Sequence, residues 1–239
     1  MIKELIKGAR KIVIKIGSNT LADADGRINT AFLDEFADQA AACIKAGKQI
    51  VVVSSGAQVA GLSTMDKWAR KKDIHYRQAL CAVGQVELMG AWRRAFENFS
   101  IRIAQILLTR DDFGDNNRTL NMRNTLFTLV DEGIVPIINE NDTVSVEEIK
   151  IGDNDNLAAQ SAILWSADLL ILVSDIDGLY DRNPREHQDA VLVEEVRDIA
   201  GVRGSISAGG AGGFGTGGII TKIEAAERAS SYGIPMILA

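Results

Sequence analysis

The chain has 239 residues, of which 46% are hydrophobic and 24% charged, and its formal net charge is −6 at pH 7. This length and composition are typical of a soluble globular protein with room for one large α/β domain or two small ones. The negative charge disfavours binding to nucleic acid or to an anionic membrane surface, so we expect neither as a partner.

Cysteine content and the N-terminal segment exclude several further classes. Cys43 and Cys81 form no CxxC pair, so neither a disulfide framework nor a zinc site is predicted. The segment MIKELIKGARK lacks the apolar stretch of a signal peptide, and no run approaches the roughly 18 apolar residues of a membrane span. We therefore expect a cytoplasmic protein.

Short apolar runs alternate with amphipathic stretches along the chain, which is typical of an α/β protein. In chain order we predict a strand over 12–16, a helix over 31–45, a strand over 50–53, a helix over 74–99 and a strand over 101–108. Next come a helix over 120–130, a strand over 134–138, a helix over 156–165, a strand over 169–173, a helix over 222–230 and a strand over 234–238.

Individual residues mark the helix ends. Thr30 is the predicted N-cap of the first helix, and Gly47 is its predicted C-terminal stop. Gly84 and Gly90 are expected to be weak points of the long helix, because glycine has a low helix propensity.

Strands that are apolar throughout, each followed by a helix, predict a mainly parallel sheet covered by helices on both faces. The predicted fold class is therefore α/β, as a three-layer αβα sandwich. Ligands of such sheets bind beyond the carboxyl ends of the strands. The residues that follow each strand are therefore the candidates for function.

Lys15 stands near the end of the first predicted strand and is followed by Ile16 and Gly17. Burial of a lysine is costly unless an anion lies beside it. One interpretation is a cation held for a phosphate, with Gly17 allowing close approach to the backbone. The alternative is a lysine at the strand end whose ammonium group reaches solvent.

Small residues, Ser54 to Ala57, follow the second strand. Such a turn leaves backbone N–H groups available for an anion, although many turns of this kind look alike. A catalytic serine would need a GxSxG motif and a partner histidine, and the motif is absent from the sequence. Both histidines, His75 and His187, stand in polar segments and are expected at the surface.

Two clusters of acids and amides follow the fourth strand, at 139–142 (NEND) and at 152–156 (GDNDN). One such cluster would be explained by a turn or a helix N-cap, because Asp and Asn favour both. Two clusters exceed what a turn requires. Their carboxylates and amides are suited to gripping an amino-acid zwitterion.

The fifth strand is followed by Ser174, Asp175, Ile176, Asp177 and Gly178. A DxDG motif after an apolar strand resembles the nucleophile motif of haloacid dehalogenase-type phosphatases, in which the first Asp is phosphorylated. In those enzymes the motif normally follows the first strand, whereas here it comes late in the chain. The phosphatase interpretation is therefore the weaker alternative.

A glycine-rich run occupies 209–218 and leads into the helix predicted near Lys222. It contains GxGxxG by count, but it does not directly follow a predicted strand, and no GxxxxGK[ST] motif is present. A flexible linker is one interpretation. The other is a phosphate site, because a glycine-rich loop before a helix N-terminus with a nearby lysine suits an anion.

Taken in order, these segments resemble the amino-acid kinase family. The stretches that carry the resemblance cover almost the whole chain: IVIKIGSNTL, VVVSSGAQVAG, QALCAVGQVELM, QILLTRDD, LNMRNTL, IVPIINENDTV, IKIGDNDNLAA, LLILVSDIDGLYDRNP and GTGGIITKIEAA. INEND and IKIGDNDN are the most specific of them. They are similar to the motifs of the family members that phosphorylate the γ-carboxylate of glutamate with ATP, the first step of proline biosynthesis.

The resemblance implies roles for individual residues. Lys15 and Lys222 would neutralise the transferring phosphoryl group, and Asp155 would orient both lysines. The residues expected to hold glutamate are Ser55, Gly56, Ala57, Asp142 and Asn154. The residues expected to contact ATP are Lys15, Ser174, Asp175, Thr216, Gly217, Gly218 and Lys222.

The resemblance also implies cofactors, assembly and domain content. Mg²⁺ would bridge the phosphates of ATP without a set of side-chain ligands, and a homodimer or homotetramer is expected. Many relatives carry a further PUA domain, which is not expected here. We expect residues 1–239 to form a single amino-acid kinase domain whose extreme C-terminus lies beyond Ala239.

A carboxylate acceptor agrees with the lack of a well-placed histidine. A glutamate side chain has a pKa near ~4.3 and is already ionised at pH 7, so no general base is needed. The remaining requirements are alignment of two anions and cancellation of their repulsion. Two alternatives stay open: a family member with another acceptor, and a non-catalytic sensor of nucleotide or amino acid.

Overall fold

The computed structural model describes residues 2–65, 73–145, 154–175, 177–182, 187–208 and 218–239. The strands are β1 (Lys11–Ile16), β2 (Gln49–Ser54), β3 (Ile103–Leu108), β4 (Val135–Glu140), β5 (Leu169–Val173) and β6 (Met236–Leu238). The helices are α1 (Ile2–Gly8), α2 (Thr30–Lys45), α3 (Ala57–Met65), α4 (Ile74–Glu97), the 3-10 helix η2 (Arg110–Phe113), α5 (Asn116–Asp131), α7 (Asn154–Trp165), α8 (Ile199–Ala208) and α9 (Gly218–Ser230).

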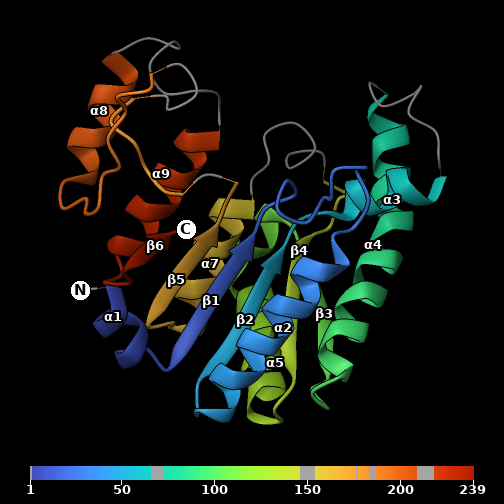
Figure 1. The fold of residues 1–239 in the computed structure, drawn as a ribbon. Helices are drawn as coiled ribbons and strands as arrows, with labels where there is room; N and C mark the ends of the chain where they lie inside the picture. The colour runs from blue at the N-terminus through green and yellow to red at the C-terminus, as the bar shows by residue number, and fades with distance from the viewer. Residues whose placement is uncertain (1, 66–72, 146–153, 176, 183–186, 209–217) are drawn as a thin grey trace.

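The central sheet is parallel, and its strands lie in the order β3-β4-β2-β1-β5-β6 (Figure 1). β1 is central, where Lys15 is in register with Val53 of β2 and Leu172 of β5. Because the strands run in the same direction, their carboxyl ends meet at one edge, the upper edge in Figure 1. The predicted mainly parallel sheet is confirmed, and the candidate residues after β1, β2, β4 and β5 come to that edge.

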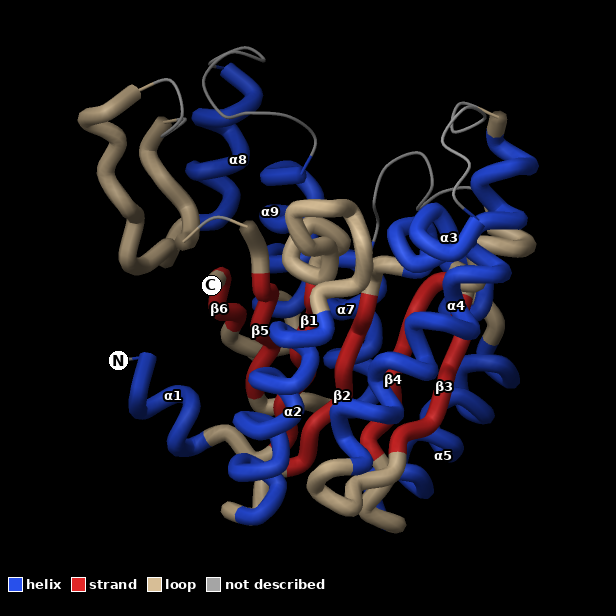
Figure 2. Tube along the Cα trace, turned by 45° about the vertical axis from the view of Figure 1, so that its right-hand side comes forward, coloured by secondary structure: helices blue, strands red, loops and turns tan. Residues whose placement is uncertain are grey.

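Helices cover both faces of the sheet, as Figures 1 and 2 show. α2, α3 and α4 pack on one face, in a buried cluster that includes Val52 and Trp92. α5, α7 and α9 pack on the other face, in a cluster that includes Val53 and Trp165. Val52 and Val53 enter different clusters because successive side chains of a strand point to opposite faces. The predicted three-layer αβα sandwich is confirmed.

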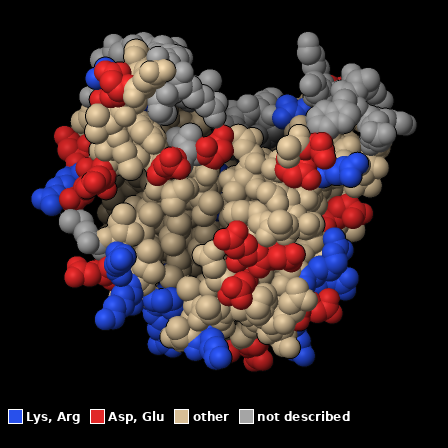
Figure 3. Space-filling model, in the orientation of Figure 1, with Lys and Arg blue, Asp and Glu red and all other residues tan. Residues whose placement is uncertain are grey.

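Charged side chains of both signs are interspersed on the face shown in Figure 3. An uncharged area lies left of the middle of that face, where β1 and β5 lie in Figure 1, and a group of acidic side chains lies to its right. Ile14 and Ile171 are half-buried and belong to the apolar surface of these two strands. Of the helices within the described ranges, none combines the length and apolarity needed to cross a membrane.

The ends of α2 show one wrong prediction and one confirmed prediction. Asn29 Oδ1 accepts a hydrogen bond from Phe32 N–H at 3.1 Å, so Asn29 and not Thr30 is the N-cap. Both residue types cap helices well, and the sequence pattern placed the helix start one position too late. At the other end, Gly47 has φ of +86° and its N–H donates to Ile44 O at 2.9 Å, as expected for a helix stop.

Gly84 has a packing role that its prediction as a weak point of α4 missed. A Cβ atom built on Gly84 would lie 1.8 Å from Ala57 O, and one built on Gly61 would lie 2.0 Å from Leu80 O. The two glycines therefore let α3 and α4 approach backbone to backbone. This contact holds the first turn of α3 beside the carboxyl edge of the sheet.

Substitution of Gly84 by alanine should destabilise the protein by about 3 kcal/mol, because the added methyl group forces two helix backbones apart. The matched control is Gly90→Ala in the same helix, where the nearest atom is Arg94 Nη1 at 3.4 Å, the end of a flexible side chain. That change should stabilise the protein by about 0.5–1 kcal/mol through helix propensity. Urea unfolding followed by circular dichroism measures both, and equal effects would contradict the close helix contact.

Candidate active site

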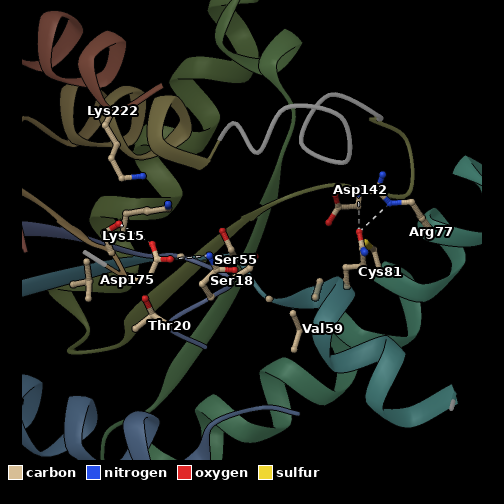
Figure 4. Close-up of a pocket in the computed structure, with 17 residues that line it drawn as sticks. Lys15, Ser18, Thr20, Ser55, Val59, Arg77, Cys81, Asp142, Asp175 and Lys222 are labelled. Carbon is tan, nitrogen blue, oxygen red and sulfur yellow. Dashed lines mark hydrogen bonds between the residues drawn. The ribbon is translucent and has the colours of Figure 1, made fainter. Parts of the chain in front are cut away.

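A cavity of about 370 Å³ lies at the carboxyl edge of the sheet (Figure 4). Its walls come from the segments after β1, β2, β4 and β5, and from α3, α4 and α9. Lys15 and Lys222 lie toward one end, and Arg77 and Asp142 lie toward the other. Residues from distant parts of the chain are thus brought to one cavity with opposed ends.

Asp155 joins the two predicted lysines. Its Oδ1 lies 2.6 Å from Lys15 Nζ, and its Oδ2 lies 3.2 Å from Lys222 Nζ. The hydroxyl of Thr221 donates to Oδ2 at 2.8 Å. Asp155 stands in the first turn of α7, where the helix dipole favours a carboxylate. Three residues from β1, α7 and α9 are therefore held as one ionic cluster.

The environment of Asp155 keeps its carboxylate ionised. Burial raises its pKa, but the charges of Lys15 and Lys222 and hydrogen bonds from Lys15 and Thr221 outweigh this and hold the pKa below its ordinary value. The cluster of Lys15, Asp155 and Lys222 holds two ammonium groups and one carboxylate, so it carries a net charge of +1 before the carboxylate of Asp175 at the same end of the cavity is counted. The two ammonium groups lie where an incoming anion can contact them.

A chain of buried amides fixes two of the residues predicted to hold substrate. Asn154 Nδ2 donates to Ser55 Oγ at 2.7 Å and to Asn139 Oδ1 at 3.0 Å. Asn139 Nδ2 in turn donates to Gln85 Oε1 at 2.9 Å, and all four side chains are buried. The chain ties the ends of β2 and β4 to α7 and α4. These hydrogen bonds hold Ser55 and Asn154 in defined orientations, although Gln85 Nε2 has no hydrogen-bond partner among the described residues.

Asp142 is a buried acid near the end of the cavity opposite the lysines, with 7% of its surface exposed. Burial and the nearby charge of Glu140 raise the pKa of Asp142 to about 7, although a hydrogen bond from Cys81 and the charge of Arg77 lower it. Asp142 therefore titrates near neutral pH. In its ionised form it is the kind of group that binds an ammonium ion.

The turn between β2 and α3 presents backbone groups to the cavity. Gly56 has φ of +100°, a conformation that favours glycine, and α3 starts immediately afterwards at Ala57. The first N–H groups of a helix have no partner inside the helix, which makes them suitable for an anion. Gly56 and Ala57 both line the cavity, beside Ser55.

Ser174 and Asp175, predicted to contact nucleotide, line the cavity after β5. Asp175 Oδ2 accepts a hydrogen bond from Asn19 Nδ2 at 3.1 Å, and Ser174 Oγ donates to Asp175 Oδ1 at 3.4 Å. Figure 4 shows Asp175 beside Lys15. The loops after β1 and β5 are thus linked at the lysine end.

The last predicted nucleotide residues lead into α9. Gly218 is the first residue of this helix, and its carbonyl accepts a hydrogen bond from Lys222 Nζ at 3.3 Å. Thr216 and Gly217 lie outside the described residues. Lys222 lies one turn into α9, and it is the residue of this helix that lines the cavity.

Several polar residues that line the cavity were not among the predicted site residues, and they include Asn19, Gln58, Arg77 and Cys81. Arg77 and Cys81 are four residues apart on α4, and Gln85 is four residues further on, so they share one stripe of the helix. This polar stripe in an otherwise apolar inner face was the available signal. The two histidines are exposed, as predicted.

Comparison with known proteins identifies the family. The model of the amino acid kinase family matches residues 10–239. A glutamate 5-kinase from Alkaliphilus metalliredigens is 64% identical over 239 residues, which are 100% of this chain and 90% of that protein. A glutamate 5-kinase from Methanococcoides burtonii is 46% identical over 239 residues, which are 99% of this chain and 64% of that protein.

Solved structures support the same fold at low sequence identity. A carbamate kinase from Giardia lamblia, solved with AMP-PNP, matches with a TM-score of 0.68 and 14% identity over 97% of this chain and 93% of that chain. A UMP kinase from Bacillus anthracis matches with a TM-score of 0.64 and 15% identity over 96% of this chain and 86% of that chain. These structural matches concern the fold, and the matched family model and the relatives show that the chain belongs to the amino acid kinase family.

Proposed function

We propose that this chain transfers the γ-phosphoryl group of ATP to the γ-carboxylate of L-glutamate, giving glutamyl 5-phosphate for proline biosynthesis. The observation that carries the proposal is the cluster of Lys15, Asp155 and Lys222 at one end of a cavity whose other end holds Asp142. The names of the relatives that share up to 64% identity over the full chain support glutamate as the acceptor.

The cavity supplies what this transfer needs. A γ-carboxylate oxygen forms a bond to the γ-phosphorus while the bond from that phosphorus to the bridging oxygen of ADP breaks. No proton moves, because the acceptor is already ionised, so no general base is required. Lys15 and Lys222 offset the repulsion between the two anions and stabilise charge on the equatorial oxygens. Asp155 holds both ammonium groups in position.

We propose ATP and Mg²⁺ as the cofactors. The first turn of α9 and Lys222 suit the phosphates, and Ser174 and Asp175 lie on the same side of the cavity as Lys15. Mg²⁺ is usually held by substrate phosphates and few protein carboxylates, and this donor set fits that mode because Asp155 is already engaged by two lysines. When bound, the ion would add positive charge to the phosphates.

The test is formation of an acyl phosphate, trapped with hydroxylamine, together with ADP release. Glutamate, aspartate and N-acetylglutamate are offered in parallel with ATP and Mg²⁺. Product from glutamate alone is the expected result. Product from aspartate or N-acetylglutamate instead would show that the acceptor is not glutamate. Nucleotide binding without any turnover would indicate a sensor. A phosphoenzyme that disappears in Asp175→Asn would instead support the phosphatase alternative.

We further propose that residues 1–239 form one domain and that the chain acts in the cytoplasm as a homodimer or homotetramer. The single sheet with both faces covered and the family match over 10–239 support one domain. Membership of the family supports the assembly. Sedimentation equilibrium of the purified chain measures its mass in solution, and a monomer of 25.8 kDa would overturn the assembly.

The value of kcat/KM for glutamate should rise as the pH increases through about 7, because only ionised Asp142 attracts the substrate ammonium group. Asp142→Asn should lower kcat/KM at pH 8 by about 10–100-fold, the value of a hydrogen bond to a charged group, and should flatten the rise. A pH profile of both enzymes measures this. An unchanged rise in the variant would assign the titration to another group.

The same titration affects folding stability. The pKa of Asp142 is raised from 3.8 to about 7 on folding, so the folded state binds the proton more tightly than the unfolded state. The stabilising contribution is full below pH 4 and is lost as the pH rises through 7. Relative to wild type, Asp142→Asn should therefore gain stability between pH 5 and pH 8, as urea unfolding at both pH values would show.

A further inference from the structure

Arg77 is a half-buried cation in the wall of the cavity, on the first turn of α4. Its Nε and Nη2 atoms donate to Gln58 Oε1 at 3.1 and 3.0 Å. Gln58 lies on α3, so the guanidinium group is held between two helices that are packed backbone to backbone. These two hydrogen bonds restrict the orientation of the guanidinium group in the cavity wall.

The charge of Arg77 is not used in an ion pair within the described part of the chain. No carboxylate oxygen there lies within 4.0 Å of it, and its hydrogen-bond acceptor is the neutral amide of Gln58. Figure 4 places Arg77 beside Asp142, and the charge of Arg77 lowers the pKa of Asp142. A guanidinium group has five N–H donors, so several remain for a ligand.

The acceptor end of the cavity therefore presents one positive and one negative group side by side, without direct contact between them. This pattern matches the α-carbon of an amino acid, which carries a carboxylate and an ammonium group on adjacent atoms. Arginine is suited to the carboxylate because its planar fork can bind both oxygens. Asp142 is suited to the ammonium group.

We infer that Arg77, oriented by Gln58, binds the α-carboxylate of the amino-acid substrate and so determines specificity for acceptors that carry this second carboxylate over acceptors that lack it. The inference deepens the proposed function and rests on it. The γ-carboxylate lies at Lys15 and Lys222, the ammonium group at Asp142 and the α-carboxylate at Arg77. Every charged group of glutamate thus has an opposite charge in the cavity.

Two glutamate analogues separate these contacts. 4-Aminobutyrate lacks the α-carboxylate, and glutarate lacks the ammonium group. In Arg77→Met the KM for glutamate and the inhibition constant of glutarate should each rise about 10–100-fold, because a charge-assisted hydrogen bond is lost. The inhibition constant of 4-aminobutyrate should stay unchanged. In Asp142→Asn at pH 8 the opposite pattern is expected: the inhibition constant of 4-aminobutyrate should rise, and that of glutarate should stay unchanged.

Arg93→Met is the matched control, because Arg93 is an exposed arginine on the same helix. It should leave all three constants unchanged. Arg77→Lys keeps the charge but loses the fork, and it should show the same analogue pattern with a smaller change. Inhibition constants do not depend on the fraction of active enzyme, so partial unfolding of Arg77→Met does not obscure the pattern.

The outcomes distinguish the inference from the proposed function. Wild-type enzyme that forms no acyl phosphate from glutamate would overturn both. Active wild-type enzyme in which Arg77→Met weakens glutamate, glutarate and 4-aminobutyrate equally, or weakens none, would overturn the inference alone. Selective loss for the two ligands that carry a carboxylate at the α-position supports it.

Discussion

Replacement of Lys15 by methionine should lower kcat with glutamate by about 10²–10³-fold, the effect of removing one preorganised charge contact in a transition state. Methionine keeps the apolar part of the side chain within β1 while it removes the ammonium group that contacts Asp155. The KM for glutamate should change less than kcat, because Lys222, Asn154 and Asp142 remain. Steady-state ADP release measures both constants.

Lys11→Met is the matched control for this substitution. Lys11 lies on the same strand at the opposite edge of the sheet, where its Nζ donates to Trp165 O at 3.3 Å and lies 4.6 Å from the centre of the Phe127 ring. Its removal should leave kcat unchanged and lower only the stability, by roughly 1 kcal/mol for a cation–π contact. A Lys15→Met enzyme with full kcat would remove this residue from the mechanism.

The fold was largely predictable because parallel strands buried on both faces are apolar along their length. The six predicted strands correspond to the six that pair among the described residues. The spacing of apolar and polar residues did not predict α3, because its sequence AQVAGLSTM has no polar face. α3 is buried at Ala57, Ala60 and Leu62 because it packs backbone to backbone on α4. No periodicity of a single segment reports such a contact.

The candidate site was predictable where its residues follow strands. Lys15, Ser55 and Asp175 were found this way, because parallel strands bring their carboxyl ends to one edge. Arg77 and Cys81 were missed because they reach the cavity from the first turns of the chain's longest described helix and do not follow a strand. Their position depends on the packing of α4 against α3, which is a tertiary property.

The other large effect is expected at Asp155, whose removal leaves two lysines facing each other in a largely buried site. Asp155→Asn should cost about 3–5 kcal/mol of stability, the usual loss when one partner of a buried ion pair is removed.

The dependence on pH has a definite sign. The pKa of Asp155 is depressed, so its stabilising contribution is present above pH 3.8 and is lost as the pH falls through the lowered value. The difference in unfolding free energy between wild type and Asp155→Asn should therefore be constant from pH 6 to pH 8. It should shrink in strong acid.

A double-mutant cycle isolates the ion pair from other effects of the Asp155 substitution. Lys15→Met combined with Asp155→Asn removes one of the two lysines that the asparagine cannot neutralise, so the double variant should lose less than the sum of the single losses. Coupling of about 1–3 kcal/mol is expected for residues in direct contact, and urea unfolding of the four proteins measures it. If the two losses are simply additive, Asp155 stabilises the fold through Thr221 and Lys222 rather than through Lys15. The 2.6 Å contact between Lys15 Nζ and Asp155 Oδ1 would then contribute nothing to stability.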